Sequence, residues 1–187
     1  MLFRSGFRLA AGGAQQALNI DADLVTYGKV IGAGLPVGAF GGKREIMECI
    51  APLGKVYQAG TLSGNPVAMI AGYTLLNELK NTPSIYSELN EKTMLLKKRM
   101  TEIFESNKIP VQINQLGSMI SVHFTKEPVV DFASSARSEQ DKFSLFFHHM
   151  LKSGIYLPPS AFESWFLNNA LSATDINKTV EAVAAFR

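Results

Sequence analysis

The sequence has one cysteine, few charged residues and no long apolar run. Because Cys49 is the only cysteine among 187 residues, no disulfide can form within the chain, and a reducing compartment is expected. No stretch reaches the apolar length that a membrane-spanning helix needs, and the first residues do not have the pattern of a signal peptide. These absences predict a cytoplasmic protein that does not enter membranes.

Charge is scarce as well. Asp, Glu, Lys and Arg make up 18% of the chain, below the usual value of about 25%, so we expect part of the surface to be covered by a partner or by further chain. The net charge is +2, and the densest basic cluster, residues 97–99, lies on an expected amphipathic helix. This pattern predicts no nucleic-acid-binding surface. No set of His, Cys, Asp and Glu residues has metal-ligand spacing, so no metal site is expected.

Strand and helix patterns alternate along the chain, which predicts an α/β fold. Turn-forming residues at 81–84 indicate a domain boundary, giving domains at 1–81 and 82–187. The periodicity predicts strands at 24–27, 37–40, 111–114 and 119–124. It predicts helices at 12–18, 43–50, 66–79, from about 85, at 139–152 with Phe143, Phe147, Met150 and Leu151 buried, and from 172 or 174 onward. Residues 125–139 are expected to be irregular, and His123 to lie on the polar face of its strand.

Lys29 is the only charged residue between Asp23 and Lys43, and its neighbours are apolar. Such a lysine either extends toward water or is held where its amine does chemistry. Glycine at high density after it favours a tight bend or a close approach of the backbone; these glycines are Gly32, Gly34, Gly38, Gly41 and Gly42. Two interpretations remain open: a strand that delivers a Schiff-base lysine to a glycine-lined pocket, or a strand followed by a flexible turn with a solvated lysine.

Two later segments carry further candidate groups. Asn65 followed by Pro66 predicts a helix start, because Asn caps free amides and Pro fits the first turn. Gly60 and Thr61, just before it, could bind an anion through a backbone amide and a hydroxyl near the helix start, or could simply form the turn. Glu163 could pair with an ammonium group, or could be an ordinary surface glutamate.

Three segments, residues 27–42, 57–66 and 159–163, together resemble class III aminotransferases, which use pyridoxal phosphate. The similarity runs from Gly6 to the last helix, and the segments occur in the family's order. Within the family, residues 57–66 and 159–163 are most similar to the aminomutase branch, which converts glutamate-1-semialdehyde to 5-aminolevulinate for tetrapyrrole synthesis. The resemblance implies the C-terminal part of a fold-type I transferase: the end of the cofactor-binding large domain in 1–81, and a small α/β domain in 82–187.

The resemblance also implies roles for single residues. Lys29 would form the Schiff base with pyridoxal phosphate and would later move protons between carbon atoms. Gly60 and Thr61 would bind the cofactor phosphate across the interface of a homodimer. Glu163 would lie near the migrating amino groups of a small amino-aldehyde substrate.

The sequence departs from the family at several points. The family's aspartate on the cofactor ring nitrogen corresponds to Met1-Leu2-Phe3, and Leu171 stands where many members carry a histidine. The family's earlier phosphate loop, ring-stacking aromatic residue and substrate arginine have no counterpart. We therefore expect a chain that lacks the N-terminal half, is inactive alone and exposes apolar surface around residues 24–40. The alternatives are another class III aminotransferase or a non-catalytic truncated product.

Overall fold

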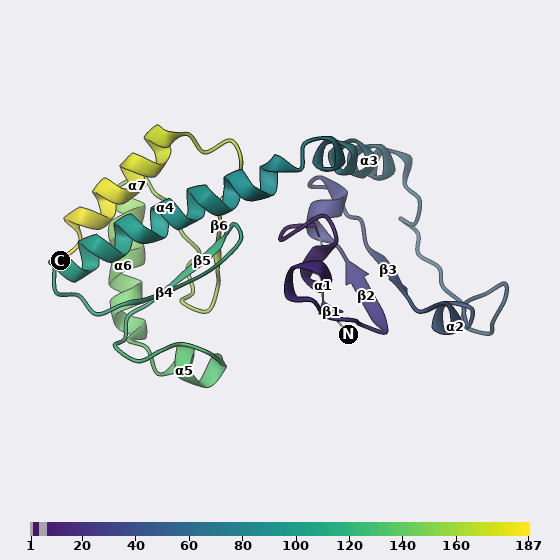
Figure 1. The fold of residues 1–187 in the computed structure, drawn as a ribbon, viewed down its shortest axis with the longest axis horizontal. Coiled ribbons are helices and arrows are strands. Elements are labelled where there is room, and N and C mark those ends of the chain that lie inside the picture. Colours follow the sequence, from purple (N-terminus) through teal and green to yellow (C-terminus); the bar gives the residue numbers. More distant parts are fainter. Residues whose placement is uncertain (1, 4–6) are drawn as a thin grey trace. The chain divides into compact units, whose positions relative to one another are not determined.

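The computed structural model describes residues 2, 3 and 7–187, which form two compact units, Met1–Ile85 and Tyr86–Arg187 (Figure 1). The predicted departure at Met1-Leu2-Phe3 falls partly outside the described residues, because Met1 is not described, and so does the start of the similarity at Gly6. Each unit has a three-stranded sheet and its own helices.

The sheet of the first unit has the order β1-β2-β3. Its strands are β1 (Leu2–Phe3), β2 (Leu24–Tyr27) and β3 (Ala39–Gly42), with β1 parallel and β3 antiparallel to β2. The strand predicted at 24–27 is confirmed, but the strand predicted at 37–40 begins two residues later. Pairing explains the shift, because Ala39 lies opposite Tyr27, the last residue of β2.

The helical segments of the first unit are α1 (Gly13–Leu18), the 3-10 turn η1 (Lys29–Gly32), α2 (Arg44–Met47) and α3 (Pro66–Asn81). The helix predicted at 43–50 is shorter than expected. The predicted start of α3 is confirmed, because the Asn65 side chain accepts hydrogen bonds from the Val67 and Ala68 amides, both at 3.1 Å. This cap satisfies two of the amides that every helix leaves free at its N-terminus.

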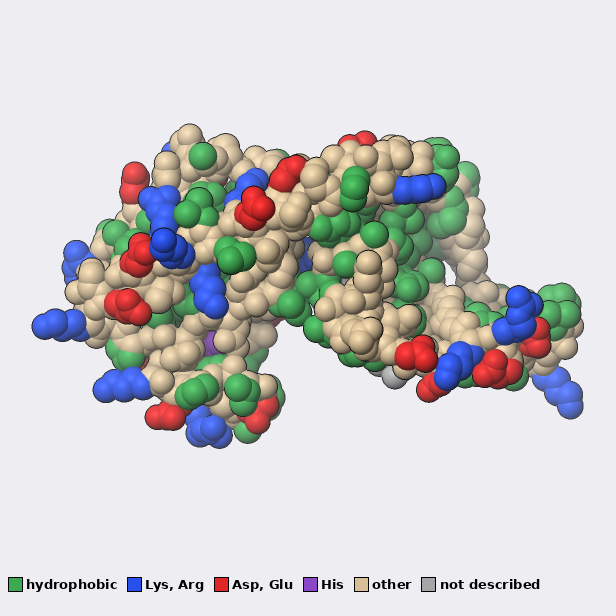
Figure 2. Space-filling view, viewed as in Figure 1, with side chains coloured by type: hydrophobic (Ala, Val, Ile, Leu, Met, Phe, Trp, Pro, Cys, Tyr) green, Lys and Arg blue, Asp and Glu red, His purple; other side chains and the backbone are tan. Residues whose placement is uncertain are grey.

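The first unit buries little apolar surface. Among its described residues, the buried hydrophobic ones are Ala14, Ile31, Ala68 and Leu79. Leu35 and Phe40 are exposed, within the region where apolar exposure was expected. Larger exposed fractions lie outside that region, in the loop between α2 and α3 and on the outer face of α3, at Leu53, Val56, Tyr57, Leu62, Val67, Ile70 and Tyr73. Figure 2 shows many hydrophobic side chains on the visible surface of the molecule.

The sheet of the second unit has the order β4-β5-β6, with both neighbouring pairs antiparallel. Its strands are β4 (Gln112–Leu116), β5 (Met119–His123) and β6 (Trp165–Phe166). Its helices are α4 (Ser84–Ser106), α5 (Phe132–Ala136), α6 (Gln140–Lys152) and α7 (Ala173–Ala185). The Ser172 side chain accepts a hydrogen bond from the Asp175 amide, so the predicted cap at 172 is confirmed.

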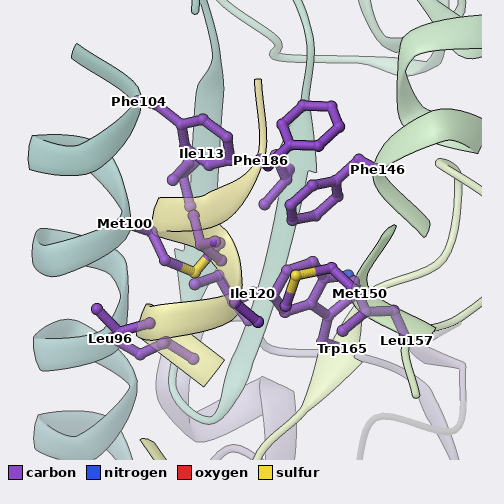
Figure 3. Packing of buried hydrophobic residues seen from close by; sticks show 14 of the residues in the cluster. Leu96, Met100, Phe104, Ile113, Ile120, Phe146, Met150, Leu157, Trp165 and Phe186 are labelled. Carbon is purple, nitrogen blue, oxygen red and sulfur yellow. The ribbon is translucent and has the colours of Figure 1, made fainter. Parts of the chain in front are cut away.

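The core of the second unit joins α4, α6 and α7 to the sheet (Figure 3). Phe146 is fully buried, and its ring centroid lies 5.1 Å from that of Phe186 and 5.5 Å from that of Phe124. The prediction for α6 was therefore wrong in part. Phe146 faces the core together with Phe143 and Met150, Phe147 is partly buried and packs against the core, and Leu151 is 44% exposed.

His123 is also placed differently from the prediction. It is buried, and its Nδ1 atom lies 3.4 Å from the Ser135 hydroxyl. Ser135 belongs to α5, a helix that the sequence did not indicate and that begins with a reciprocal cap between Asp131 and Ser134. Burial lowers the pKa of His123 because the charged imidazole loses water.

Candidate functional site

Lys29 lies just after strand β2, at the first position of η1. Gly28 continues the extended backbone, and Lys29 then turns into the left-handed region with a φ of 55°. The turn ends at Ala33, which is also left-handed with a φ of 51°, and whose N–H donates to the Val30 carbonyl at 3.0 Å. Left-handed backbone is unfavourable for residues with a Cβ atom, so contacts from elsewhere must hold this turn.

A cavity of about 680 Å³ opens beside Lys29. It is lined by residues 26–29, from the end of β2 and the start of η1, and by residues 36–40, which lead into β3. Its volume lies within the range of about 300–1,000 Å³ typical of small-molecule sites. The Lys29 side chain is exposed, and it forms part of the wall of this cavity. The lysine is therefore solvated, as in one interpretation, and it borders a pocket, as in the other.

The turn is packed against other parts of the unit. Ile31, inside η1, is 6% exposed, and α3, whose Ala68 is 3% exposed, lies against η1. Val37 packs closely on the other side, since a Cβ added at Gly32 would lie 3.2 Å from the Val37 Cβ. The lysine therefore stands on a packed turn rather than on a flexible loop.

Asp23 and Lys43 lie beside each other at the end of the β2–β3 pair that is farther from Lys29. The Lys43 ammonium lies 2.6 Å from the Asp23 carboxylate, and the Lys43 amide donates to the Asp23 carbonyl at 3.0 Å. The hydrogen bond and the charge of Lys43 lower the pKa of Asp23. Both side chains are substantially exposed, so this pair orients the strand ends rather than adding much stability.

Gly60 and Thr61 lie in an exposed loop before α3. The Gly60 carbonyl accepts the Ser63 amide at 2.9 Å, and the Leu62 carbonyl accepts the Asn65 amide at 3.1 Å. The first free amides of α3, at Val67 and Ala68, are already bonded to Asn65. An anion here would therefore use the loop itself, not those two helix amides. Neither Gly60 nor Thr61 lines the cavity at Lys29.

Glu163 belongs to the second unit, so the structure does not place it relative to Lys29. Its amide donates to the Ser160 carbonyl at 3.1 Å, and its side chain is exposed. Ala161 and Trp165, on either side of it, are buried. The carboxylate is therefore presented to solvent from a loop that the core holds in place.

Leu171 has a packing role in this unit. It contacts the edge of the core, and its carbonyl accepts a hydrogen bond from the Lys92 ammonium at 2.6 Å. Over the described ranges, no three His, Cys, Asp or Glu side chains gather closely enough to hold a metal ion. In the same part of the chain, no helix has both the length and the apolarity to cross a membrane.

Two features at the Lys29 turn did not follow from the sequence analysis. One is the left-handed backbone at Lys29 itself. The other is Gly72, which is buried in α3 and faces the backbone of η1. A lone glycine inside an otherwise good helical pattern usually has a packing reason, and this signal was available in the sequence.

Comparison with known proteins identifies the family. The family model for class III aminotransferases matches residues 4–182. A glutamate-1-semialdehyde 2,1-aminomutase from Flavobacterium johnsoniae is 51% identical over 179 residues, covering 96% of this chain and 42% of that protein. The protein of the same name from Sulfurihydrogenibium azorense is 55% identical over 177 residues, covering 95% of this chain and 41% of that protein. The chain thus spans about two-fifths of the length of these curated relatives.

Solved structures share the fold. An omega-transaminase from Sphaerobacter thermophilus has a TM-score of 0.88 at 29% identity, over 96% of this chain and 41% of that one. A beta-phenylalanine aminotransferase from Variovorax paradoxus has a TM-score of 0.88 at 32% identity, over 97% and 42%. A glutamate-1-semialdehyde-aminomutase from Pseudomonas aeruginosa PAO1 has a TM-score of 0.83 at 18% identity, over 97% and 42%, which is a likeness of fold alone. The predicted α/β transferase fold is confirmed, and the chain belongs to the class III aminotransferase family.

Proposed function

We propose that this chain is part of an enzyme that uses pyridoxal phosphate to convert glutamate-1-semialdehyde into 5-aminolevulinate, a step that feeds tetrapyrrole synthesis. The observation that carries the proposal is the identity of 51% over 96% of the chain to a protein named for this aminomutase reaction. Among the solved structures, identity is 29% and 32% to two transaminases and 18% to an aminomutase, so the assignment depends on the curated relatives. The first unit would then be the end of the cofactor-binding domain, and the second the small domain.

The residues at Lys29 fit the reactive end of such a cofactor. A primary amine stands at the wall of a cavity of suitable volume, Gly28 and Gly38 leave the backbone accessible, and Val37 and Phe40 supply apolar surface for a flat ring. Pyridoxal phosphate, when bound, supplies an aldehyde that reacts with amines and a ring that draws electrons from a neighbouring carbon. Lys29 would hold the cofactor through Nζ, and the same nitrogen, when free, can accept and donate a proton.

Gly60 and Thr61 would contact the cofactor phosphate of a second copy of the chain. Their absence from the cavity at Lys29 agrees with a site shared between two copies. The same loop exposes Leu53, Tyr57 and Leu62, and apolar groups gathered in this way are typical of a protein interface. We therefore propose a homodimer, with the loop of each copy completing the site of the other.

Glu163 would orient the amino groups of the substrate. Its carboxylate is exposed and its loop is anchored by buried neighbours, which suits a group that must meet a cationic nitrogen at a defined position. The substrate in this proposal is a small amino aldehyde. A cytoplasmic location is proposed with it, since the exposed Cys49 suits a reducing compartment.

The cofactor assignment can be tested by adding pyridoxal phosphate to the chain and recording its visible absorption. The proposal expects a band that Lys29→Ala abolishes and that Lys55→Ala, at another exposed lysine of the same unit, leaves unchanged. Borohydride reduction followed by peptide mass spectrometry should place the label on Lys29. A label spread over several lysines would contradict the assignment.

The substrate assignment needs the rest of a relative's sequence, supplied as a fusion or as a separate polypeptide. The complete protein should form 5-aminolevulinate from glutamate-1-semialdehyde, and Glu163→Gln should lower that rate. Transfer of amino groups between other substrates without aminolevulinate formation would favour another class III aminotransferase. Cofactor binding without turnover of any such substrate would favour a non-catalytic product.

A further inference from the structure

Gly72 is the point at which α3 lies against the turn that carries Lys29. A methyl group at position 72 would overlap the carbonyl oxygen of Ile31, and would lie 3.5 Å from the Ile31 carbonyl carbon and 3.9 Å from the Gly32 Cα. The obstructing atoms belong to the backbone, so no side-chain rotation can make room. Either α3 or the turn must move if residue 72 gains a side chain.

The turn has no freedom to absorb such a shift without moving Lys29. Ile31 lies two residues after Lys29, and its side chain is buried. Both ends of the turn, Lys29 and Ala33, already have left-handed backbone that is unfavourable for residues with a Cβ atom. Backbone held in a sparsely populated region persists only when its surroundings impose it, and such residues cluster at functional sites.

Helix stability alone does not explain a glycine at position 72. Glycine is among the weakest helix formers, and this one lies in the interior of α3, which spans Pro66–Asn81. The loss of helix stability at this glycine must therefore be offset by another interaction. The structure shows one such interaction, the close packing of α3 on the Ile31 backbone.

We propose that Gly72 is a positioning residue for Lys29: the absence of a side chain at 72 lets α3 press on the Ile31 carbonyl and so sets the backbone from which the lysine amine reaches the cavity. This inference deepens the proposed function, because a fixed amine matters most if Lys29 holds a cofactor. The placement of the turn can nevertheless be measured without any cofactor.

Gly72→Ala is the test, with Gly41→Ala as its matched control. Gly41 is in the same unit, has no positive φ, and a methyl group there would meet nothing within 4 Å. Amide hydrogen exchange at Ala33 and Leu35 reports on the turn, because these amides donate to the carbonyls of Val30 and Gly32. Gly72→Ala should speed exchange at these two amides roughly tenfold, whereas Gly41→Ala should change it less than about twofold.

A second readout is spectroscopic. With pyridoxal phosphate added, Gly72→Ala should weaken the visible band at least about threefold and shift the pH at which its absorption changes, since a small displacement of a reacting group has large effects. Gly41→Ala should leave both unchanged.

The outcomes separate the two proposals. Absence of a visible band in the unchanged protein would defeat the cofactor assignment, while the exchange data would still decide the role of Gly72. Unchanged exchange at Ala33 and Leu35 in Gly72→Ala would overturn the positioning role. It would also be overturned if the amides of β2 and α1 lost protection to the same degree, because Gly72 would then support the whole unit and not the turn in particular. Amides of the second unit serve as the internal reference for an intact sample.

Discussion

The two units bury apolar side chains to very different extents. The second unit has a continuous core contributed by three helices and the sheet, including the fully buried Met100, Phe104 and Phe146 (Figure 3). In the described part of the first unit, Ile31 and Leu79 are the largest buried apolar side chains, while Tyr57 is 83% exposed. Each fully buried large side chain stabilises a fold by about 1.5–3 kcal/mol, so the second unit has much more to hold it together.

This difference separates the candidate groups. Lys29, Gly60 and Thr61 lie in the thinly packed unit, whereas Glu163 is presented by the well-packed one. Lys29 and Ala33, at the two ends of the turn, are kept in left-handed backbone within a unit that has little core of its own. A second copy or further chain that covered the exposed apolar residues would therefore stabilise the unit that carries Lys29 more than the unit that carries Glu163.

The largest expected effect tests the core of the second unit. Phe146→Ala removes a ring that packs on Phe124 and Phe186 and should lower the free energy of unfolding of that unit by about 3–5 kcal/mol. Fluorescence of Trp165, the only tryptophan, measures this directly because its ring lies 6.2 Å from that of Phe146. Phe132→Ala, at a ring 74% exposed, is the control and should change it little. Equal losses in both variants would contradict a core centred on Phe146.

One helix cap in each unit allows the stability of the two units to be compared with substitutions of similar energetic cost. Asn65 caps α3 in the first unit, and Ser172 caps α7 in the second. Each change to alanine should remove about 1 kcal/mol. Because the first unit has less stability in reserve, Asn65→Ala should expose amides throughout that unit, whereas Ser172→Ala should affect mainly the start of α7. Hydrogen exchange read by mass spectrometry follows both units in one sample. If Ser172→Ala exposed amides throughout its unit while Asn65→Ala affected only the start of α3, the first unit would not be the less stable one.

The smallest expected effect is a pH dependence confined to the second unit. Burial lowers the pKa of His123 below its ordinary value of 6.5, so the unfolded chain binds this proton more tightly than the folded one. Stability should therefore fall as pH decreases from above 6.5 toward the lowered pKa. Urea unfolding followed by Trp165 fluorescence should show this slope, and His123→Asn should reduce it.

The other ionisable groups remain in that variant, including His148, His149 and Asp131, which lines the same cavity as His123. The difference between the two pH curves thus isolates position 123. Parallel curves would mean that His123 keeps its ordinary pKa in the folded protein.

Local sequence signals predicted the elements whose ends depend on their own residues. Asn65-Pro66 and Ser172 start their helices as expected, because a cap needs only the next two or three amides. Sequence signals failed where the limits or the rotation of an element depend on another element that pairs or packs with it. The third strand starts at Ala39 and not at residue 37, because it pairs with β2. Phe146 is fully buried in the core and Phe147 only packs against its edge, because the packing of α6 on α7 and the sheet sets the rotation of α6.

The sequence by itself determined the family, since the segments around Lys29, Thr61 and Glu163 resemble class III aminotransferases and the family model matches residues 4–182. Tertiary structure alone decided how the lysine is held. Lys29 has left-handed backbone, and the turn that it starts is packed at Ile31 against Gly72, which lies far away along the chain. Residue patterns report preferences over a few neighbours, whereas a strained turn is held by whatever packs against it, and that becomes visible only once the chain has folded.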